Sequence, residues 1–295
     1  MQSSVTPSII AGNPAAPLQA RSLSRPVSAW TIIWATTLKE LQIAGRYLPN
    51  LAGNFIELAI RVGFFFLLAS VVTLNGNNGP ALAGRDLFIF FQGGLLLFVF
   101  NRPTVWGPIQ AVTDDLYNGA LEYLYSTPCS RYAYYVGAVL ARVLINMVIF
   151  LPLYLVLILS SSAGLGNMLM VLLACLLILI ALTAMGIMIA ILALLWRQVS
   201  SIANILSILF EMLAGAYIPI TAFPEAAQHL AYFLPYTWGY DLIRHYSFDG
   251  DWPTLLPVWQ EWLVISLFAL LFTLLSRCLL ARAEEQAKQN GLHII

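Results

Sequence analysis

Charged side chains are scarce in this chain of 295 residues. They make up 9% of the sequence, whereas a typical soluble domain carries about 25%. Hydrophobic residues make up 60% of the chain, and its mean hydropathy is +0.81. A water-soluble globular protein is therefore excluded, and the function should be sought across or within a membrane.

The sequence also lacks the motifs of several enzyme classes. There is no G-x-x-x-x-G-K-[ST] phosphate loop, and no glycine directly precedes a lysine. A His-Glu-x-x-His motif and a nucleophile elbow are absent, and the three histidines are dispersed. The chain therefore binds no ATP through a phosphate loop, and a membrane-embedded enzyme is disfavoured.

Two further scarcities bear on partners. Only two lysines, Lys39 and Lys288, are present, and no basic patch supports binding of nucleic acid. The three cysteines, Cys129, Cys175 and Cys278, lack metal-ligand spacing. We therefore expect no metal centre and no nucleic-acid partner.

What the chain does have is long apolar runs, and a helix needs roughly 20 such residues to cross a membrane. None alternates polar and apolar residues as a lipid-exposed β-strand does. The sequence thus predicts an all-α membrane protein with six transmembrane helices, at about residues 51–74, 87–106, 143–160, 168–196, 202–220 and 255–280.

The basic residues predict the orientation of these spans, because lysine and arginine collect in cytoplasmic loops. Counted through six spans, those outside the spans lie on the side of both termini, except Arg85 and Arg244. Both termini are therefore expected in the cytoplasm. Residues 1–27, rich in serine, proline and alanine, are predicted to be a disordered cytosolic tail, and residues 281–295 a short cytosolic one.

Residues 28–47 show a different pattern. Apolar residues recur there at steps of three and four, at Trp30, Ile33, Trp34 and Leu38. This spacing favours an amphipathic helix lying in the membrane interface, with its tryptophans at headgroup depth. The alternative is that these residues are the first turns before a span.

Two segments between the spans are also informative. Residues 107–131 contain a short helical pattern with an exposed polar face, which suits either a partner-binding helix or an ordinary solvated loop. Residues 221–253 are rich in aromatic side chains, which favour the interface. We expect two short helices there, at about 224–234 and 237–245 and divided by Pro235, forming an outer re-entrant hairpin between spans five and six. Asp241 and Arg244, three residues apart, are placed to pair.

Three charged residues fall inside the predicted spans. Glu57 and Arg61 are four residues apart on the first span, a spacing that allows an ion pair within one helix. Glu211 stands without a basic neighbour in the fifth span. Charges inside a membrane are costly and mark functional sites by default. Glu211 is expected either to face Arg61 across an interface or to contact a substrate.

Four features resemble the permease subunit of ABC-2-type ABC exporters, over about residues 28–280. The first is the surface helix before the first span. The other three are, in one-letter code, DLYNGALEYL with STPCSR at 115–131, LAGAYIP at 213–219, and FP at 223–224 with LPYTWGYDLIR at 234–244. Ala120 and Leu234 depart from the pattern of the family, which has threonine and asparagine there.

The resemblance implies a two-component pump. Two permease chains, identical or different, would surround a path in lipid, and a pair of ATPase subunits would bind ATP and Mg²⁺ below them, so this chain itself would bind no cofactor. The ATPase-coupling residues would be Asp114, Asp115, Gly119, Leu121, Glu122 and Leu124. The outer gate would comprise Pro219, Phe223, Pro224, Pro235, Asp241 and Arg244.

The resemblance also implies a place and a cargo. The place would be the bacterial plasma membrane, and the cargo a hydrophobic or lipid-linked molecule, either a drug or a lipid. Export of a polysaccharide or glycolipid by the same fold is an alternative. Two further readings are an ATP-independent carrier, which would use a group such as Glu211 but is expected to show inverted repeats that the two halves lack, and a non-transporting scaffold.

Overall fold

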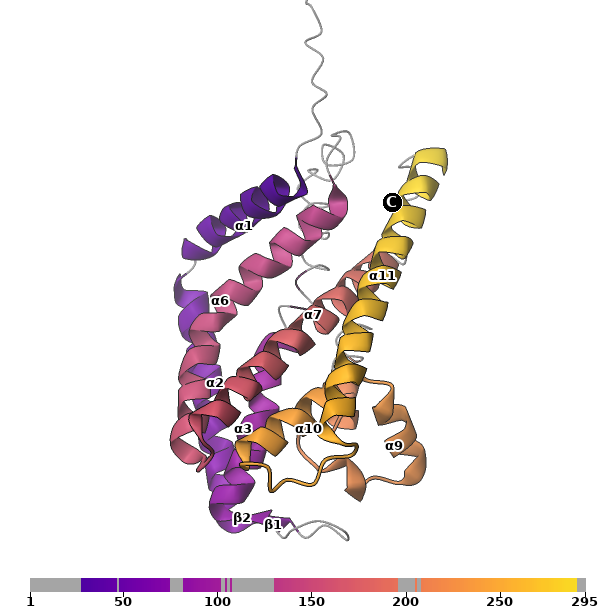
Figure 1. Cartoon of the computed structure of the whole chain (residues 1–295). Coiled ribbons are helices and arrows are strands. Elements are labelled where there is room, and N and C mark those ends of the chain that lie inside the picture. Colours follow the sequence, from indigo (N-terminus) through magenta and orange to yellow (C-terminus); the bar gives the residue numbers. More distant parts are fainter. Residues whose placement is uncertain are drawn as a thin grey trace, which may run out of the picture.

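The computed structural model describes residues 28–46, 48–74, 82–101, 104, 107, 130–195, 205 and 208–290. These residues form a helical bundle in which α1 (Ala29–Gly45) lies at one end (Figure 1). The opposite end carries two short strands, β1 (Thr73–Leu74) and β2 (Leu82–Ala83), which pair antiparallel. The predicted tail 1–27 lies outside the described residues, and so do residues 108–129 of the predicted coupling segment 107–131.

Five of the described helices are long and apolar enough to cross a membrane. They are α2 (Leu48–Val71), α3 (Gly84–Asn101), α6 (Arg131–Ser160), α7 (Leu165–Leu195) and α11 (Val258–Asn290). Each overlaps one predicted apolar run, so five of the six predicted spans are confirmed as helices of sufficient length. Of the run at 202–220, the structure describes residue 205 and the residues from 208; these are helical from 208 to 213 and then turn.

Helix α6 begins well before its apolar run at 143–160 because its first turn is capped. The hydroxyl of Ser130 accepts a hydrogen bond from the backbone N–H of Ala133 at 3.3 Å. Helix α1 packs along this early part of α6, where the hydroxyl of Thr37 donates to the carbonyl oxygen of Gly137 at 3.1 Å. A Cβ atom at position 137 would lie 2.7 Å from the carbonyl oxygen of Ile33, so glycine permits this close approach.

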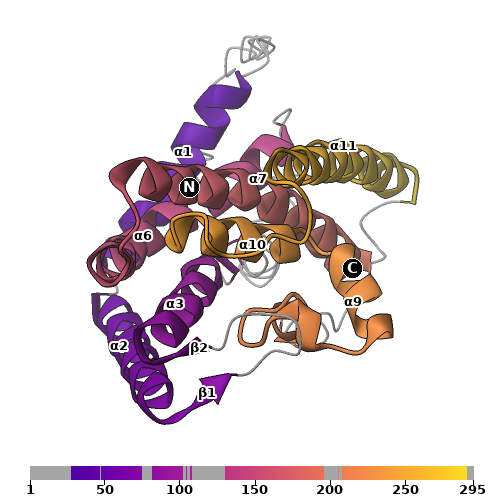
Figure 2. The same cartoon turned by 60° about the horizontal axis from the view of Figure 1, so that its bottom comes forward.

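Helix α3 is the centre of the bundle. Its residues are almost all buried from Leu87 to Asn101, although the sequence gives it polar members such as Gln92. Helix α10 (Pro235–Ser247) packs between α3 and α7, whereas α2 lies at the edge of the bundle beside α3 (Figure 2). The faces that α2 and α11 turn away from the bundle are apolar and exposed, as expected of helices that meet lipid or another chain.

The segment between the turn after residue 213 and α11 contains the two short helices that the sequence predicts. They are α9 (Glu225–Tyr232) and α10, preceded by one turn of 3-10 helix, η2 (Ile220–Ala222). Pro235 does not divide the helices but occupies the first turn of α10, where its missing N–H costs nothing. Eleven of the thirteen residues of α10 are buried, whereas α9 buries only Ala231.

Candidate functional site

The two charges of the first span lie against each other on α2. Arg61 donates from Nε and Nη2 to Oε1 of Glu57, at 3.2 and 3.0 Å, as the four-residue spacing predicts. The guanidinium group of Arg61 also stacks over the ring of Phe98, 4.2 Å from its centroid. Both charged side chains remain partly exposed, at 36% for Arg61 and 39% for Glu57. The pair therefore lies on an open face of the bundle.

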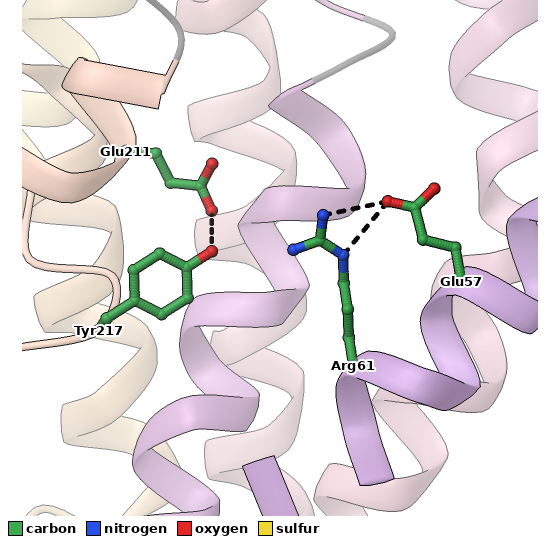
Figure 3. A network of polar contacts seen from close by, with 4 residues as sticks. All are labelled: Glu57, Arg61, Glu211 and Tyr217. Atoms are coloured by element: carbon green, nitrogen blue, oxygen red, sulfur yellow. Dashed lines mark hydrogen bonds and ion pairs between the residues drawn. The ribbon is translucent and has the colours of Figure 1, made fainter. Parts of the chain in front are cut away.

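The third predicted intramembrane residue lies on the other side of Arg61. Glu211 is buried, and its Oε1 accepts a hydrogen bond of 2.6 Å from the hydroxyl of Tyr217. Figure 3 shows Arg61 between Glu57 and this second pair. Arg61 and Asn101 are both close enough to interact electrostatically with the carboxyl group of Glu211. Within one chain, Glu211 thus lies on the side of Arg61 away from Glu57, and its role in the site stays a prediction.

Further polar side chains, from α3 and α10, lie beside these residues within the bundle. Asn101, at the end of α3, accepts a hydrogen bond of 2.6 Å from the hydroxyl of Tyr236 in α10. One turn further along α10, the buried hydroxyl of Tyr240 has no hydrogen-bond partner among the residues that the structure describes. We call Glu57, Arg61, Asn101, Glu211, Tyr217 and Tyr236 the polar cluster. It links α2, α3, the end of the fifth predicted span and α10.

Three consecutive phenylalanines of α2, residues 64–66, lie near the polar cluster. Phe65 is buried between Phe91 and Tyr217, with ring centroids 4.7 and 5.6 Å away. Its neighbours Phe64 and Phe66 are exposed, at 57% and 60%. Phe64 lies one turn beyond Arg61 on the same face of α2 and is thus next to the charged pair.

Arg244 joins α10 to the turn that follows residue 213. It is 3% exposed, and its Nη2 donates to the carbonyl oxygens of Gly215 and Ala216 at 2.7 and 2.9 Å. The guanidinium carbon lies 3.6 Å from the centroid of Phe90 in α3. Burial lowers the pKa of Arg244 to about 9, which leaves the side chain charged at neutral pH.

Gly94 of α3 also approaches this turn, since a Cβ there would lie 2.5 Å from the carbonyl oxygen of Ala216.

The expected pairing of Asp241 with Arg244 is wrong, since no ion pair joins these two described side chains. Asp241 instead accepts hydrogen bonds from the indole N–H of Trp252 at 3.0 Å and from the backbone N–H of Leu255 at 2.7 Å. Arg244 instead donates to the backbone carbonyl oxygens of Gly215 and Ala216. Tertiary contacts override the local spacing here, and the two side chains join α10 to two different segments.

The other predicted gate residues divide into an exposed and a buried group. Phe223 is half-buried, and Pro224, at the N-terminal cap of α9, is exposed, whereas Pro219 before η2 is half-buried. Pro235 is buried at the start of α10. The structure thus separates an outer surface formed by η2 and α9 from a firmly packed α10. No group of three metal-ligating side chains occurs within the described part of the chain.

The six predicted coupling residues cannot be placed, because positions 114, 115, 119, 121, 122 and 124 lie outside the described residues. Sequence reasoning found Glu57, Arg61 and Glu211 by their charge in apolar runs but missed Asn101, Tyr217 and Tyr236. The signal for Asn101 was available, as an amide in an apolar run.

The chain was also compared with known proteins. The family model described as ABC-2 type transporter matches residues 94–248, more than half of the chain. No curated protein matches it. The matched range begins in α3 and ends after α10, so it contains Asn101, Glu211, Tyr217 and Arg244.

Proposed function

The chain belongs to the ABC-2 type transporter family, whose membrane domain is a permease subunit without an ATPase site of its own, and from that premise we infer that it forms half of an export path. The chain is a multi-pass membrane protein. We place it in a bacterial plasma membrane with both termini in the cytoplasm, because the basic residues outside the spans gather on that side.

The proposed path rests mainly on one observation. Glu57 and Arg61 are partly exposed although they lie in the middle of an apolar helix. Charged side chains within a membrane face a bundle interior or a water-filled cavity rather than lipid. The open face of α2 that bears this pair therefore faces either the path or a second permease chain. Glu211 and Tyr217 extend the same surface from the neighbouring segment.

The permease is proposed to work as a dimer with a pair of ATPase subunits. A single copy leaves the charged face of α2 uncovered, and a second copy on the other side of the path would close it. Energy would come from the partner subunits, which bind ATP and Mg²⁺ and contact residues 107–131. Within that segment, Asp115, Gly119, Leu121, Glu122 and Leu124 match the motif on which the resemblance rests, and Asp114 precedes it.

The outer gate is proposed to move at η2 and α9 rather than at α10. Arg244 and Asp241 fasten α10 to its neighbours, whereas α9 packs only one fully buried residue against the bundle. In this proposal Pro219, Phe223 and Pro224 belong to the part of the gate that moves. Pro235, Asp241 and Arg244 belong to α10, which stays in place. The segment 221–253 is proposed to dip into the outer leaflet, as its aromatic side chains favour the interface.

The proposed substrate is hydrophobic or lipid-linked and carries a polar group. Phe64 and Phe66 provide exposed aromatic surface next to the Glu57–Arg61 pair, which suits an amphiphile better than a fully polar chain. Export of a polysaccharide or glycolipid is the second candidate within the same family. An ATP-independent carrier is a third, and buried Glu211 with its tyrosine partner is the feature that favours it.

Purification of the chain from its native membrane in mild detergent, followed by mass spectrometry, tests the two-component proposal. A phosphate-loop ATPase in stoichiometric amount is expected. A preparation without any ATPase, under conditions that preserve other membrane complexes, would contradict the proposal and favour the carrier. Substrates are then found by transport into vesicles that contain the purified complex.

A further inference from the structure

Two acidic side chains are buried next to each other where α10 meets α11. Asp241 of α10 is 6% exposed and Glu261, in the first turn of α11, is fully buried. The two carboxyl groups accept hydrogen bonds from consecutive backbone N–H groups, those of Leu255 and Leu256, and therefore lie next to each other. Neither takes part in the polar cluster around Arg61, and neither forms an ion pair with a described basic side chain. The arrangement therefore needs a separate explanation.

The backbone before α11 holds both carboxyl groups in place. Consecutive N–H groups donate to them, from Leu255 to Oδ2 of Asp241 at 2.7 Å and from Leu256 to Oε1 of Glu261 at 3.0 Å. The indole N–H of Trp252 donates to Oδ1 of Asp241 at 3.0 Å. Three of the four carboxyl oxygens thus accept a hydrogen bond from a defined donor.

The fourth oxygen, Oε2 of Glu261, is buried and has no hydrogen-bond partner among the described residues. An ionised oxygen without a donor is expensive to bury. Arg244 interacts electrostatically with Asp241, although its Nη2 donates to Gly215 and Ala216 rather than to either carboxyl group. One positive charge compensates one ionised acid, so two ionised acids here would leave a negative charge uncompensated inside the protein.

We propose that Asp241 and Glu261 share one proton, which Glu261 carries on Oε2 and donates to Asp241. Two carboxyl groups in contact keep a proton between them because both cannot ionise at little cost. The shared proton satisfies the fourth oxygen and joins α10 to the start of α11. This proton site lies at the same end of the molecule as β1 and β2, away from α1 (Figure 1).

Loss of the proton is expected to loosen the outer segment. It would place two negative charges side by side and remove the bond between α10 and the start of α11, whereas Arg244 and the buried residues of α10 still hold that helix. Other titratable groups nearby are Arg244 and Tyr240 on α10, together with His245, whose Nδ1 lies 3.0 Å from the carbonyl oxygen of Trp252. They remain in place when Glu261 alone is replaced, which allows their contributions to be separated.

The test uses the full chain in lipid nanodiscs and the variant Glu261→Gln. The amide of glutamine donates to Asp241 and accepts from Leu256 without a titratable proton, so the geometry is kept. Infrared spectra report the carbonyl stretch of protonated carboxyl groups, and melting temperature is recorded from about pH 6 to about pH 10. Asp251→Asn, which removes an exposed acid from the adjacent loop, is the matched control.

The proposal predicts a protonated-carboxyl band in the wild type that Glu261→Gln lacks and Asp251→Asn keeps. Because the folded wild type holds a proton that the unfolded chain releases, its melting temperature is expected to fall by several degrees as the pH rises. The fall should be smaller in Glu261→Gln. Equal bands in wild type and Glu261→Gln, or equal losses of stability with pH, would overturn the proposal.

A second measurement serves if Glu261→Gln does not fold. The variant Glu211→Gln removes the other buried glutamate of the described residues, and its spectra at low and high pH are compared. Disappearance of a protonated-carboxyl band as the pH rises supports the shared proton. The absence of any such band at the lower pH overturns it.

Discussion

Arg61 donates two hydrogen bonds to a single oxygen of Glu57, one turn away on the same helix. In water such an exposed pair would contribute little to stability. Within a membrane it has a different role, because pairing lowers the cost of holding two charges among apolar residues. A partly exposed pair of this kind is explained by a polar path or a partner chain, and the predictions below test that explanation.

Replacement of Arg61 by methionine is expected to reduce transport by about tenfold or more, which corresponds to about 1.4 kcal/mol of lost transition-state stabilisation. The change removes the two hydrogen bonds that Glu57 accepts from Arg61 and alters the charge of the open face. Transport into vesicles is the measurement, and Ile56→Met, at an exposed apolar position of α2 away from the Glu57–Arg61 face, is the control. Full rescue by the charge-swapped double variant Glu57→Arg/Arg61→Glu would show a structural role only, against the proposal.

Replacement of Tyr217 by phenylalanine removes the 2.6 Å hydrogen bond to Glu211 and keeps the ring packed on Phe65. A typical hydrogen bond contributes about 0.5–1.5 kcal/mol, so we expect transport to fall by roughly two- to tenfold while the complex still assembles. Tyr232→Phe, outside the polar cluster, should transport normally. Unchanged transport by Tyr217→Phe would remove this residue from the site.

The sequence predicts part of this site because some signals are local. Charge inside an apolar run identifies Glu57, Arg61 and Glu211, and a spacing of four residues predicts the ion pair on one helix. The apolar runs likewise predict six spans, of which five are found as helices of sufficient length among the described residues, since length and hydropathy decide membrane insertion. Signals of this kind need no knowledge of the packing.

The rest of the site depends on packing between distant segments. Asn101 and Tyr236 are 135 positions apart and meet only because α10 lies against α3. Spacing within α10 suggests that Asp241 pairs with Arg244, yet backbone groups from two other segments take both side chains. Local pattern does not reveal such competition, because the competing donors and acceptors belong to turns whose position is set by the whole fold.

Substitution of Gly94 by alanine is expected to destabilise the protein by about 1–3 kcal/mol, the usual cost of overpacking. The added Cβ would lie 2.5 Å from the carbonyl oxygen of Ala216, a backbone atom in the turn that Arg244 binds. Gly63→Ala on α2 is the control, as nothing lies within 4 Å of its Cβ position. Thermal unfolding in detergent should separate the two variants, and equal melting temperatures would contradict the close approach.

Reversal of charge at Glu122 tests the proposed coupling segment. The variant Glu122→Arg should insert normally but lose transport and transport-stimulated ATP hydrolysis, because the carboxylate would be replaced by a cation at the proposed ATPase contact. Retention of the ATPase on copurification and transport rates equal to the wild type would exclude this residue from coupling. Lys288→Glu, in the C-terminal tail, controls for charge reversal at the cytosolic side.

The central claim is that the face of α2 bearing Glu57 and Arg61 borders water inside the membrane. Single cysteines at Asn54 and Phe64 lie on that face, and cysteines at Ile56 and Ala59 lie away from it, by helical spacing. In a chain whose three native cysteines are replaced, a water-soluble thiol reagent should label the first two positions much faster than the others. Equal labelling of all four positions, or faster labelling at Ile56 and Ala59, would contradict the proposed path.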